Sequence, residues 1–122
     1  MKKLLILLFI LVPFSSNALE KETTFNHDLF KKAQSDGKVV IVSSWIKYCS
    51  SCASQMKVLN TAKKEFKNIE YFAFDVTNKE ISNLFDVQYQ STLLIFKNNK
   101  EVYRSIGETS KAEIYKAINS VI

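Results

Sequence analysis

Two cysteines separated by two residues lie between an apolar segment and a long helical pattern, and they are the only cysteines in the chain. Segment 39–42 is a β-branched run typical of a buried strand, and Cys49 and Cys52 follow it shortly after. A Cys-x-x-Cys motif between a strand and a helix predicts a thiol–disulfide redox site. A structural disulfide is the alternative, but so short a loop removes little entropy from the unfolded chain. A zinc site usually needs four ligands, whereas the chain adds only one histidine, His27.

The first residues have the pattern of a secretory signal peptide. Two lysines precede an apolar run over 4–14, and the small residues Ser16 and Ala18 stand at positions −3 and −1 of a cleavage point. The run is too short to cross a bilayer, which takes about 20 apolar residues. We therefore expect a signal peptide over 1–18, a mature domain over 19–122 and a periplasmic location in a bacterium. Retention as an uncleaved membrane anchor is the alternative.

The mature domain is expected to carry a mild positive charge. Removing Lys2 and Lys3 from the 17 basic residues leaves 15 against 12 acidic ones, and no basic cluster is longer than Lys63-Lys64. A small and dispersed excess favours solubility and gives no reason to expect nucleic acid as a partner. The serines lack the accompanying histidine and aspartate pattern of a hydrolase.

Apolar periodicity predicts alternating helices and strands along the mature chain. Helices are expected over 28–35, 50–66 and 80–85, and after a capping box that joins Ser110 and Glu113. Strands are expected over 38–44, 69–76, 92–96 and 101–106, the last two joined by a turn at Asn98-Asn99. This order predicts an α/β domain with a central mixed sheet and helices on both faces.

Segment 40–52 (VIVSSWIKYCSSC), segment 92–98 and Ile106-Gly107 together form a much more specific pattern than Cys-x-x-Cys alone. On these stretches the chain, from about residue 28 onward, resembles the thioredoxin family. In this resemblance Trp45 stands at the family's active-site tryptophan, Tyr48 at the aromatic residue before the first cysteine, and Gly107 at a glycine where the last strand passes the site. It implies a thioredoxin-like fold and a periplasmic thiol–disulfide oxidoreductase that needs no cofactor or metal.

The chain departs from the family pattern around the two cysteines. The dipeptide between them is Ser-Ser rather than Gly-Pro, Ser43 replaces the buried acid, and Ala73 replaces the lysine that often pairs with it. Ser91 stands at the family's cis-proline. A cis peptide bond before a residue other than proline costs about 2.5–4 kcal/mol, so we expect a trans bond before Ser91. Without the proline ring, we expect both sulfurs to be more open on the side of Gln90 and Ser91.

The two cysteines are predicted to have different roles. Cys49 precedes the first helical turn, where unpaired N–H groups and the helix dipole stabilise a thiolate, so it is the expected nucleophile. Cys52 shares a helical stripe with Met56 and Leu59 and should resolve the mixed disulfide from the core side. With Ser43 in place of the acid, no side-chain base for Cys52 is evident. Either a water near Ser43 or Ser44 takes the proton, or turnover is slow.

Substrate binding is predicted at four residues around the dithiol. Trp45 and Tyr48 are expected to form an apolar rim on which a partner chain docks, and Gln90 and Ser91 to line the other side. Packing of Trp45 under the loop is an alternative that is compatible with this role. Lys47 is expected to be an exposed, solvated charge.

Three function classes fit these patterns, and we favour the first. The protein is expected to be a monomer that exchanges the Cys49–Cys52 dithiol with protein thiols or disulfides as a reductant, supplied by a thiol-transferring membrane partner. The second class is a metal or Fe–S carrier in which the two cysteines supply half a site. The third is a binding module that uses the Trp45 and Tyr48 surface while the disulfide stays locked.

Overall fold

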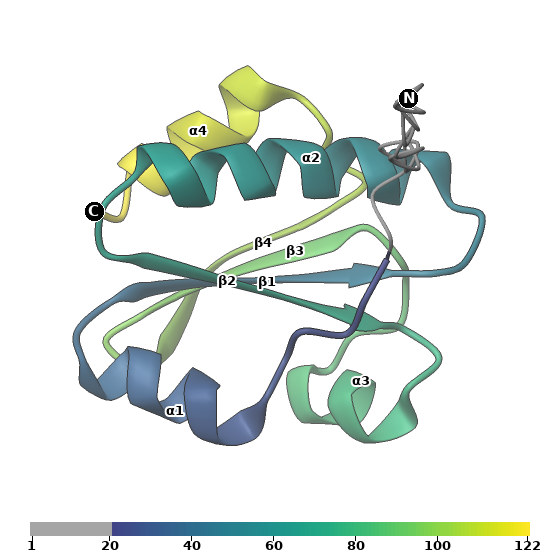
Figure 1. The fold of residues 1–122 in the computed structure, drawn as a ribbon, viewed down its shortest axis with the longest axis horizontal. Helices are drawn as coiled ribbons and strands as arrows, with labels where there is room; N and C mark the ends of the chain where they lie inside the picture. Colours follow the sequence, from purple (N-terminus) through teal and green to yellow (C-terminus); the bar gives the residue numbers. More distant parts are fainter. Residues whose placement is uncertain (1–20) are drawn as a thin grey trace, which may run out of the picture.

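Four strands form a sheet between two pairs of helices (Figure 1). The computed structural model describes residues 21–122, so the predicted signal peptide over 1–18 lies outside the described residues. All eight predicted elements are present, and each predicted end lies within one residue of the observed end. They are α1 (His27–Ser35), β1 (Val39–Trp45), α2 (Ser50–Glu65), β2 (Ile69–Asp75), α3 (Lys79–Phe85), β3 (Thr92–Lys97), β4 (Lys100–Ile106) and α4 (Lys111–Asn119).

The sheet is mixed, in the order β2-β1-β3-β4. Strand β1 pairs with β2 in parallel and with β3 antiparallel, and β3 pairs antiparallel with β4. The parallel register places Ser43 opposite Ala73. The two positions at which the chain departs from the family's buried acid and lysine are therefore neighbours in the sheet. The expected thioredoxin-like α/β fold is confirmed.

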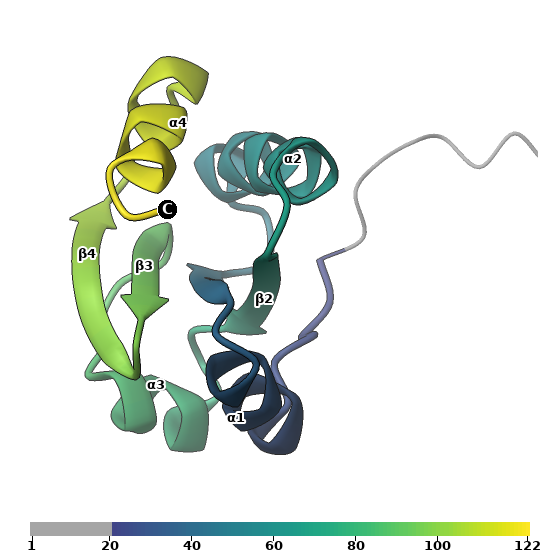
Figure 2. The same ribbon diagram turned by 90° about the vertical axis from the view of Figure 1, so that its left-hand side faces the viewer.

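Helices α2 and α4 cover one face of the sheet (Figure 2). Because side chains alternate along a strand, Val39, Ile41 and Trp45 of β1 point to this face. They pack with Cys52 and Leu59 of α2. The same cluster holds Met56, Ala62, Ile69, Tyr71, Ala73, Leu93, Ile95, Ile114, Ala117 and Ile118. One of the two cysteines is thus part of the hydrophobic core.

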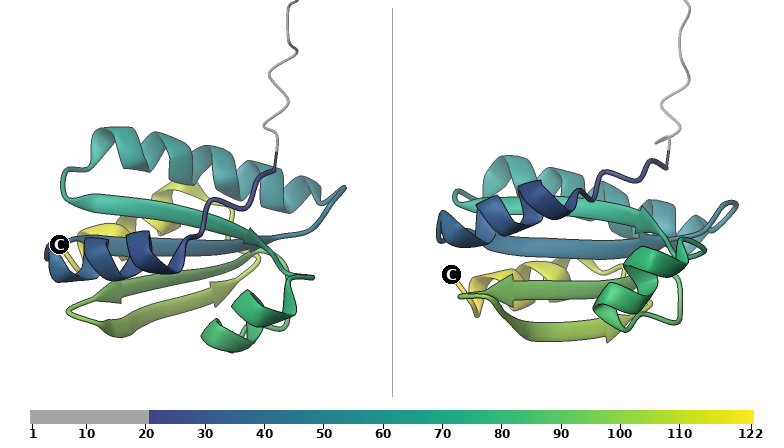
Figure 3. Two further views of the ribbon diagram at one scale, coloured as in Figure 1. Left: turned by 60° about the horizontal axis from the view of Figure 1, so that its bottom comes forward. Right: turned by 90° about the horizontal axis from the view of Figure 1, so that it is seen from below.

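Helices α1 and α3 lie over the opposite face, which Figure 3 shows from below. Its core is built largely from aromatic rings: Phe30, Phe72, Phe74 and Phe85 are buried, and Phe25 and Phe96 pack against them. The Phe85 ring lies 5.1 Å from the ring of Phe25, 5.4 Å from that of Phe30, 5.6 Å from that of Phe96 and 5.9 Å from that of Phe74, measured between centroids. Phe72 and Phe74 of β2 and Phe96 of β3 thus contribute their rings to this core.

A side chain caps the start of each helix. Asn26, Cys49, Asn78 and Ser110 each accept a hydrogen bond from an N–H of the first turn. Ser110 takes the N–H of Glu113, as the predicted capping box requires, but the N–H of Ser110 itself is taken by the carboxylate of Glu108 at 2.8 Å. No helix within residues 21–122 is long and apolar enough to span a membrane.

Residues 21–25, called here the N-terminal strap, run along the outer edge of β2. The N–H groups of Thr24 and Phe25 donate to the carbonyl of Ala73 at 2.8 and 3.1 Å, and the Thr24 hydroxyl accepts from the Ala73 N–H. The indole of Trp45 donates to the carbonyl of Glu22 at 3.2 Å. The strap therefore protects part of an exposed sheet edge and passes over Trp45 toward the cysteines.

Candidate active site

A disulfide joins Cys49 and Cys52 at the N-terminus of α2, with 5.3 Å between the Cα atoms. Cys49 is the N-cap residue, and the N–H of Cys52 donates to Cys49 Sγ at 3.2 Å. Cys49 is partly buried, whereas Cys52 is 0% exposed. A hydrogen bond and the helix dipole both favour a negative charge on Cys49 Sγ. The positions of the two cysteines fit their predicted roles, which remain predictions.

A tight turn leads into Cys49. The N–H of Cys49 donates to the Ile46 carbonyl at 3.3 Å, and Tyr48 adopts a φ of 67°, which is uncommon for a residue with a side chain. The Tyr48 side chain is 90% exposed, and the ammonium of Lys47 lies 5.1 Å from the centre of its ring. The turn therefore presents an aromatic ring to solvent beside the disulfide.

Lys21 of the N-terminal strap fastens this turn. Its ammonium donates to the carbonyl of Ile46 at 3.0 Å and to that of Cys49 at 2.8 Å. The contact holds the turn closed and places a positive charge next to Cys49, which favours the thiolate after reduction. Sequence reasoning missed Lys21 because this long-range contact has no signature in the local pattern.

The Ser91 hydroxyl lies on the disulfide. Its Oγ is 3.1 Å from Cys52 Sγ, 3.7 Å from Cys49 Sγ and 3.2 Å from the Ser51 hydroxyl. The 90–91 peptide is trans, as expected; residues 21–122 contain no cis peptide bond. The expectation of open sulfurs on the side of Ser91 is wrong: Ser91 is 3% exposed and covers them with its hydroxyl, because a positive φ of 59° turns its side chain toward them.

The backbone of Ser91 is bonded on both sides. Its N–H donates to the Ser44 carbonyl at 2.8 Å, and its carbonyl accepts from the Gly107 N–H at 2.9 Å and from Gln55 Nε2 at 3.1 Å. A Cβ on Gly107 would meet nothing within 4 Å, so the glycine is suited to its φ of 81° rather than to a lack of space. Gln90, its predicted companion in substrate binding, is exposed.

Of the two predicted rim residues, only Tyr48 is exposed. Trp45 is 8% exposed and packs in the core cluster of Cys52 beneath the strap, which is the packing role foreseen for it. Two exposed apolar residues that sequence reasoning did not select are close to the site in the chain: Tyr89 precedes Ser91 by two residues, and Ile106 precedes Gly107. Both side chains are more than half exposed.

A pair of hydroxyls occupies the place of the family's buried acid. Ser43 Oγ lies 2.6 Å from the Tyr71 hydroxyl, and both residues are buried. Burial raises the pKa of Tyr71, against a smaller opposing effect of the Ser43 hydrogen bond, so Tyr71 stays protonated and neutral. The site therefore has no charged group at this position that could take a proton from Cys52.

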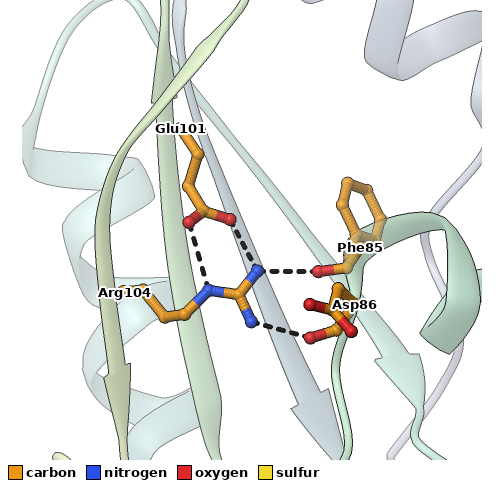
Figure 4. Close-up of polar contacts among 4 residues, drawn as sticks. All are labelled: Phe85, Asp86, Glu101 and Arg104. Carbon is orange, nitrogen blue, oxygen red and sulfur yellow. Dashed lines mark hydrogen bonds and ion pairs between the residues drawn. The ribbon is translucent and has the colours of Figure 1, made fainter.

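Arg104 of β4 holds the end of α3, from which the chain leads to Ser91 (Figure 4). Its guanidinium donates to the carbonyls of Phe85 and Asp86 at 2.7 and 2.9 Å and pairs with both carboxylate oxygens of Glu101. The hydrogen bond with Glu101 raises the pKa of Arg104. Since these bonds satisfy the last carbonyls of α3, they fix the point from which segment 87–91 departs.

Two further residues at the site were missed by sequence reasoning. Ser44 Oγ donates to the Tyr89 carbonyl at 2.7 Å and accepts from the Thr92 N–H at 3.0 Å, so it clamps the loop around Ser91. Gln55 is fully buried and also bonds the Glu108 carbonyl at 2.9 Å. A polar residue on the apolar stripe of α2 was a usable signal for Gln55.

Residues 21–122 hold no cluster of three His, Cys, Asp or Glu that could bind a metal.

Comparison with known proteins gives consistent matches. A thioredoxin family model matches residues 17–120. Thioredoxin from Mycobacterium bovis is 30% identical over 90 residues, covering 72% of this chain and 78% of that protein. A bifunctional thioredoxin reductase/thioredoxin from Mycobacterium leprae is 28% identical over 95 residues, covering 76% of this chain and 21% of that protein. This chain thus spans about a fifth of the length of that bifunctional relative.

Solved structures agree. Trxlp from Edwardsiella tarda superposes with a TM-score of 0.70 at 30% identity, covering 76% of this chain and 93% of that one. Fasciola hepatica thioredoxin superposes with a TM-score of 0.69 at 22% identity, covering 78% of this chain and 89% of that one, which shows the shared fold. With the Cys49–Cys52 pair at the start of α2, the protein is a thioredoxin-like thiol–disulfide oxidoreductase. The chain belongs to the thioredoxin family.

Proposed function

We propose that this protein is an exported, monomeric oxidoreductase that reduces protein disulfides in a bacterial periplasm. The observation that carries the proposal is the asymmetry of the pair, in which Cys49 caps a helix and Cys52 is buried beneath it. In this arrangement Cys49 attacks a substrate disulfide and Cys52 resolves the resulting mixed disulfide. Protein disulfides are the expected substrate because exposed Tyr48, Tyr89 and Ile106 offer an apolar docking surface.

Export is inferred from the sequence of residues 1–18. Its two lysines, apolar run and small residues before the cleavage point are the features that a secretory signal requires. Mass measurement of material released from the periplasm tests this inference, with a chain that begins at Leu19 as the expected result. Recovery of the full-length chain in the membrane fraction would replace export with membrane anchoring.

The direction of electron flow is inferred from the family. In the Mycobacterium leprae relative, thioredoxin and thioredoxin reductase form one bifunctional protein, which supports the use of such a domain as a carrier of reducing electrons. In an oxidising compartment a reductant has to be recharged, and a thiol-transferring membrane protein is the proposed donor.

The reduction potential of the Cys49–Cys52 couple tests the direction. We expect a value near that of thioredoxin, about −270 mV, from equilibration with glutathione or dithiothreitol. A value near about −120 mV, typical of a strong periplasmic oxidant, would reverse the proposed direction.

The exchange itself is tested with insulin as the disulfide substrate. We expect Cys49→Ser to abolish insulin reduction, and Cys52→Ser to retain a reactive Cys49 that accumulates mixed disulfides. Ser50→Ala is the matched control, since it alters the same helical turn without touching either sulfur. A wild-type chain that binds partner proteins but never reduces insulin would instead indicate a binding module.

A further inference from the structure

The two sulfurs are connected by a chain of hydroxyl groups. Cys52 Sγ lies 3.1 Å from Ser91 Oγ, Ser91 Oγ lies 3.2 Å from Ser51 Oγ, and Ser51 Oγ lies 3.3 Å from Cys49 Sγ. Each of these distances is within hydrogen-bond reach for the atoms involved. A hydroxyl can donate one hydrogen bond while it accepts another, so the series forms a continuous path for a proton.

The path leads from the core to solvent. Cys52 is fully buried, Ser91 is almost fully buried, and Ser51 is exposed. The inner hydroxyl is held in place by its own backbone, which is bonded to Ser44, Gly107 and Gln55. The backbone that carries this hydroxyl over Cys52 is therefore held in place by the fold.

Cys52 needs such a path because disulfide exchange requires it to lose a proton. Only a thiolate attacks a disulfide, and burial in apolar surroundings opposes loss of the thiol proton. At the position of the family's buried acid the chain has Ser43, whose hydroxyl is already bonded to the neutral Tyr71. Among residues 21–122, the hydroxyl in contact with Cys52 Sγ is that of Ser91, at 3.1 Å, and it can accept the thiol proton.

Other charged or titratable groups near the site are engaged elsewhere. From the strap, Lys21 binds the carbonyls of Ile46 and Cys49, and in the turn the ammonium of Lys47 lies over the Tyr48 ring. From the segment before α4, the carboxylate of Glu108 accepts from the Ser110 N–H. From β2, Tyr71 bonds Ser43.

We propose that Ser91 and Ser51 are catalytic residues that carry the proton of Cys52 to solvent during resolution. The step rests on the dithiol exchange proposed above. As Cys52 Sγ attacks Cys49 Sγ of the mixed disulfide, the thiol proton passes to Ser91 Oγ, the Ser91 proton to Ser51 Oγ and the Ser51 proton to water. A new bond joins the two cysteine sulfurs, the bond between Cys49 and the substrate sulfur breaks, and the substrate leaves with the electron pair as a thiolate.

The experiment separates attack from resolution in a single turnover. The reduced full chain is mixed with excess 5,5′-dithiobis(2-nitrobenzoate), which releases one coloured thiolate when Cys49 attacks and a second when Cys52 resolves. We expect Ser91→Ala to slow the second release at neutral pH by about 100-fold, the lower end of what positioned proton transfer contributes, and to leave the first release nearly unchanged. Ser51→Ala should slow the second release less, because water can replace an exposed hydroxyl.

The pH profile and the solvent isotope effect show whether the hydroxyl moves a proton. In Ser91→Ala the second release should recover as the pH rises, since hydroxide then takes the proton, while the wild type should vary less. The solvent deuterium isotope effect on the second release should be larger in the wild type than in Ser91→Ala. Ser50→Ala is the matched control and should behave as the wild type.

Two results are decisive. A folded Ser91→Ala variant with an unchanged rate and pH profile for the second release overturns the relay and leaves the exchange activity standing. A wild type that gives neither release contradicts the proposed function instead. Should Ser91→Ala fail to fold, Ser91→Gly removes the hydroxyl at a position whose positive φ suits glycine, and the same expectations apply.

Discussion

The two faces of the sheet are packed with different chemistry. The face under α1 and α3 is filled mainly by phenylalanine rings and aliphatic side chains, and the buried hydroxyl of Ser82 on α3 donates to the Val76 carbonyl. The face under α2 and α4 also buries Cys52, the Gln55 amide and the hydroxyls of Ser43 and Tyr71. Buried polar groups destabilise a fold unless they are bonded, whereas packed apolar rings stabilise it without further conditions. The comparison suggests that the first face supplies stability and the second holds the redox chemistry.

The largest expected effect concerns the aromatic face. Phe85→Ala should lower the free energy of unfolding by about 3–5 kcal/mol, because it leaves a cavity among four neighbouring rings. Denaturant unfolding measures this loss, and Leu84→Ala, at an exposed position on the same helix, should change it by less than about 0.5 kcal/mol. A Phe85→Ala protein that stays folded but has a strongly altered reduction potential would show that the two faces are not separable.

The next effect concerns the segment that covers the disulfide. Ser91→Pro should lower the free energy of unfolding by about 2–4 kcal/mol, because proline removes the N–H that bonds the Ser44 carbonyl and requires a negative φ where the chain has 59°. We expect protein-disulfide reductase activity to fall with it. Thermal and urea unfolding measure this loss of stability. Ser91→Gly is the control, since glycine keeps the N–H and accepts the positive φ. A Ser91→Pro variant as stable as the wild type would contradict the observed loop conformation.

A smaller effect is expected for the hydroxyl pair beneath the site. Tyr71→Phe should lower the free energy of unfolding by about 1–3 kcal/mol, because it leaves the Ser43 hydroxyl buried without its partner. The double variant Ser43→Ala with Tyr71→Phe should recover part of this loss, since no unpaired group remains. If the double variant is no more stable than Tyr71→Phe alone, the pair does not act as a unit.

The same tyrosine gives the fold a dependence on alkaline pH. Because the pKa of Tyr71 is raised in the folded protein, its stabilising contribution is complete below the ordinary tyrosine pKa of about 10 and is lost as the pH rises above it. Burial, with the hydrogen bond and charge of Glu65, also raises the pKa of Tyr115 to about 12. Urea unfolding above about pH 9 should therefore show a shallower decline in Tyr71→Phe than in the wild type, with Tyr115→Phe as the comparison.

The smallest effect concerns the strap. Lys21→Met should raise the pH midpoint of Cys49 alkylation by about half a unit, because it removes a positive charge that is partly screened by solvent. Lys21→Arg should restore most of the wild-type value. Lys47→Met, which removes a nearby charge that faces the Tyr48 ring, should shift the midpoint less. A larger shift from Lys47→Met would assign the electrostatic role to the turn instead of the strap.

Sequence reasoning succeeded where structure depends on local pattern. The helices and strands follow the spacing of apolar residues, and the contrast between Cys49 at a helix cap and Cys52 on the buried stripe follows from helical periodicity. The trans bond before Ser91 follows from the energetics of a single peptide unit.

It failed where the conformation depends on contacts between distant segments. The side-chain direction of Ser91 is fixed by bonds to Ser44, Gln55 and Gly107, and none of these pairings can be inferred from neighbouring residues. The contact between Lys21 and the turn before Cys49 likewise depends on the path of the strap along β2. Comparison with a family that has proline at position 91 suggested an open site, because it gave no information on where a serine hydroxyl would point.

The burial of Trp45 has a practical consequence for watching the protein at work. It is the only tryptophan in the chain, and it packs in the same cluster as Cys52 under the carbonyl of Glu22. The fluorescence of an indole changes with its surroundings. The emission of Trp45 should therefore report both reduction of the disulfide and release of the strap. The protein thus contains an intrinsic fluorescent probe, and its redox state can be followed in real time without a label.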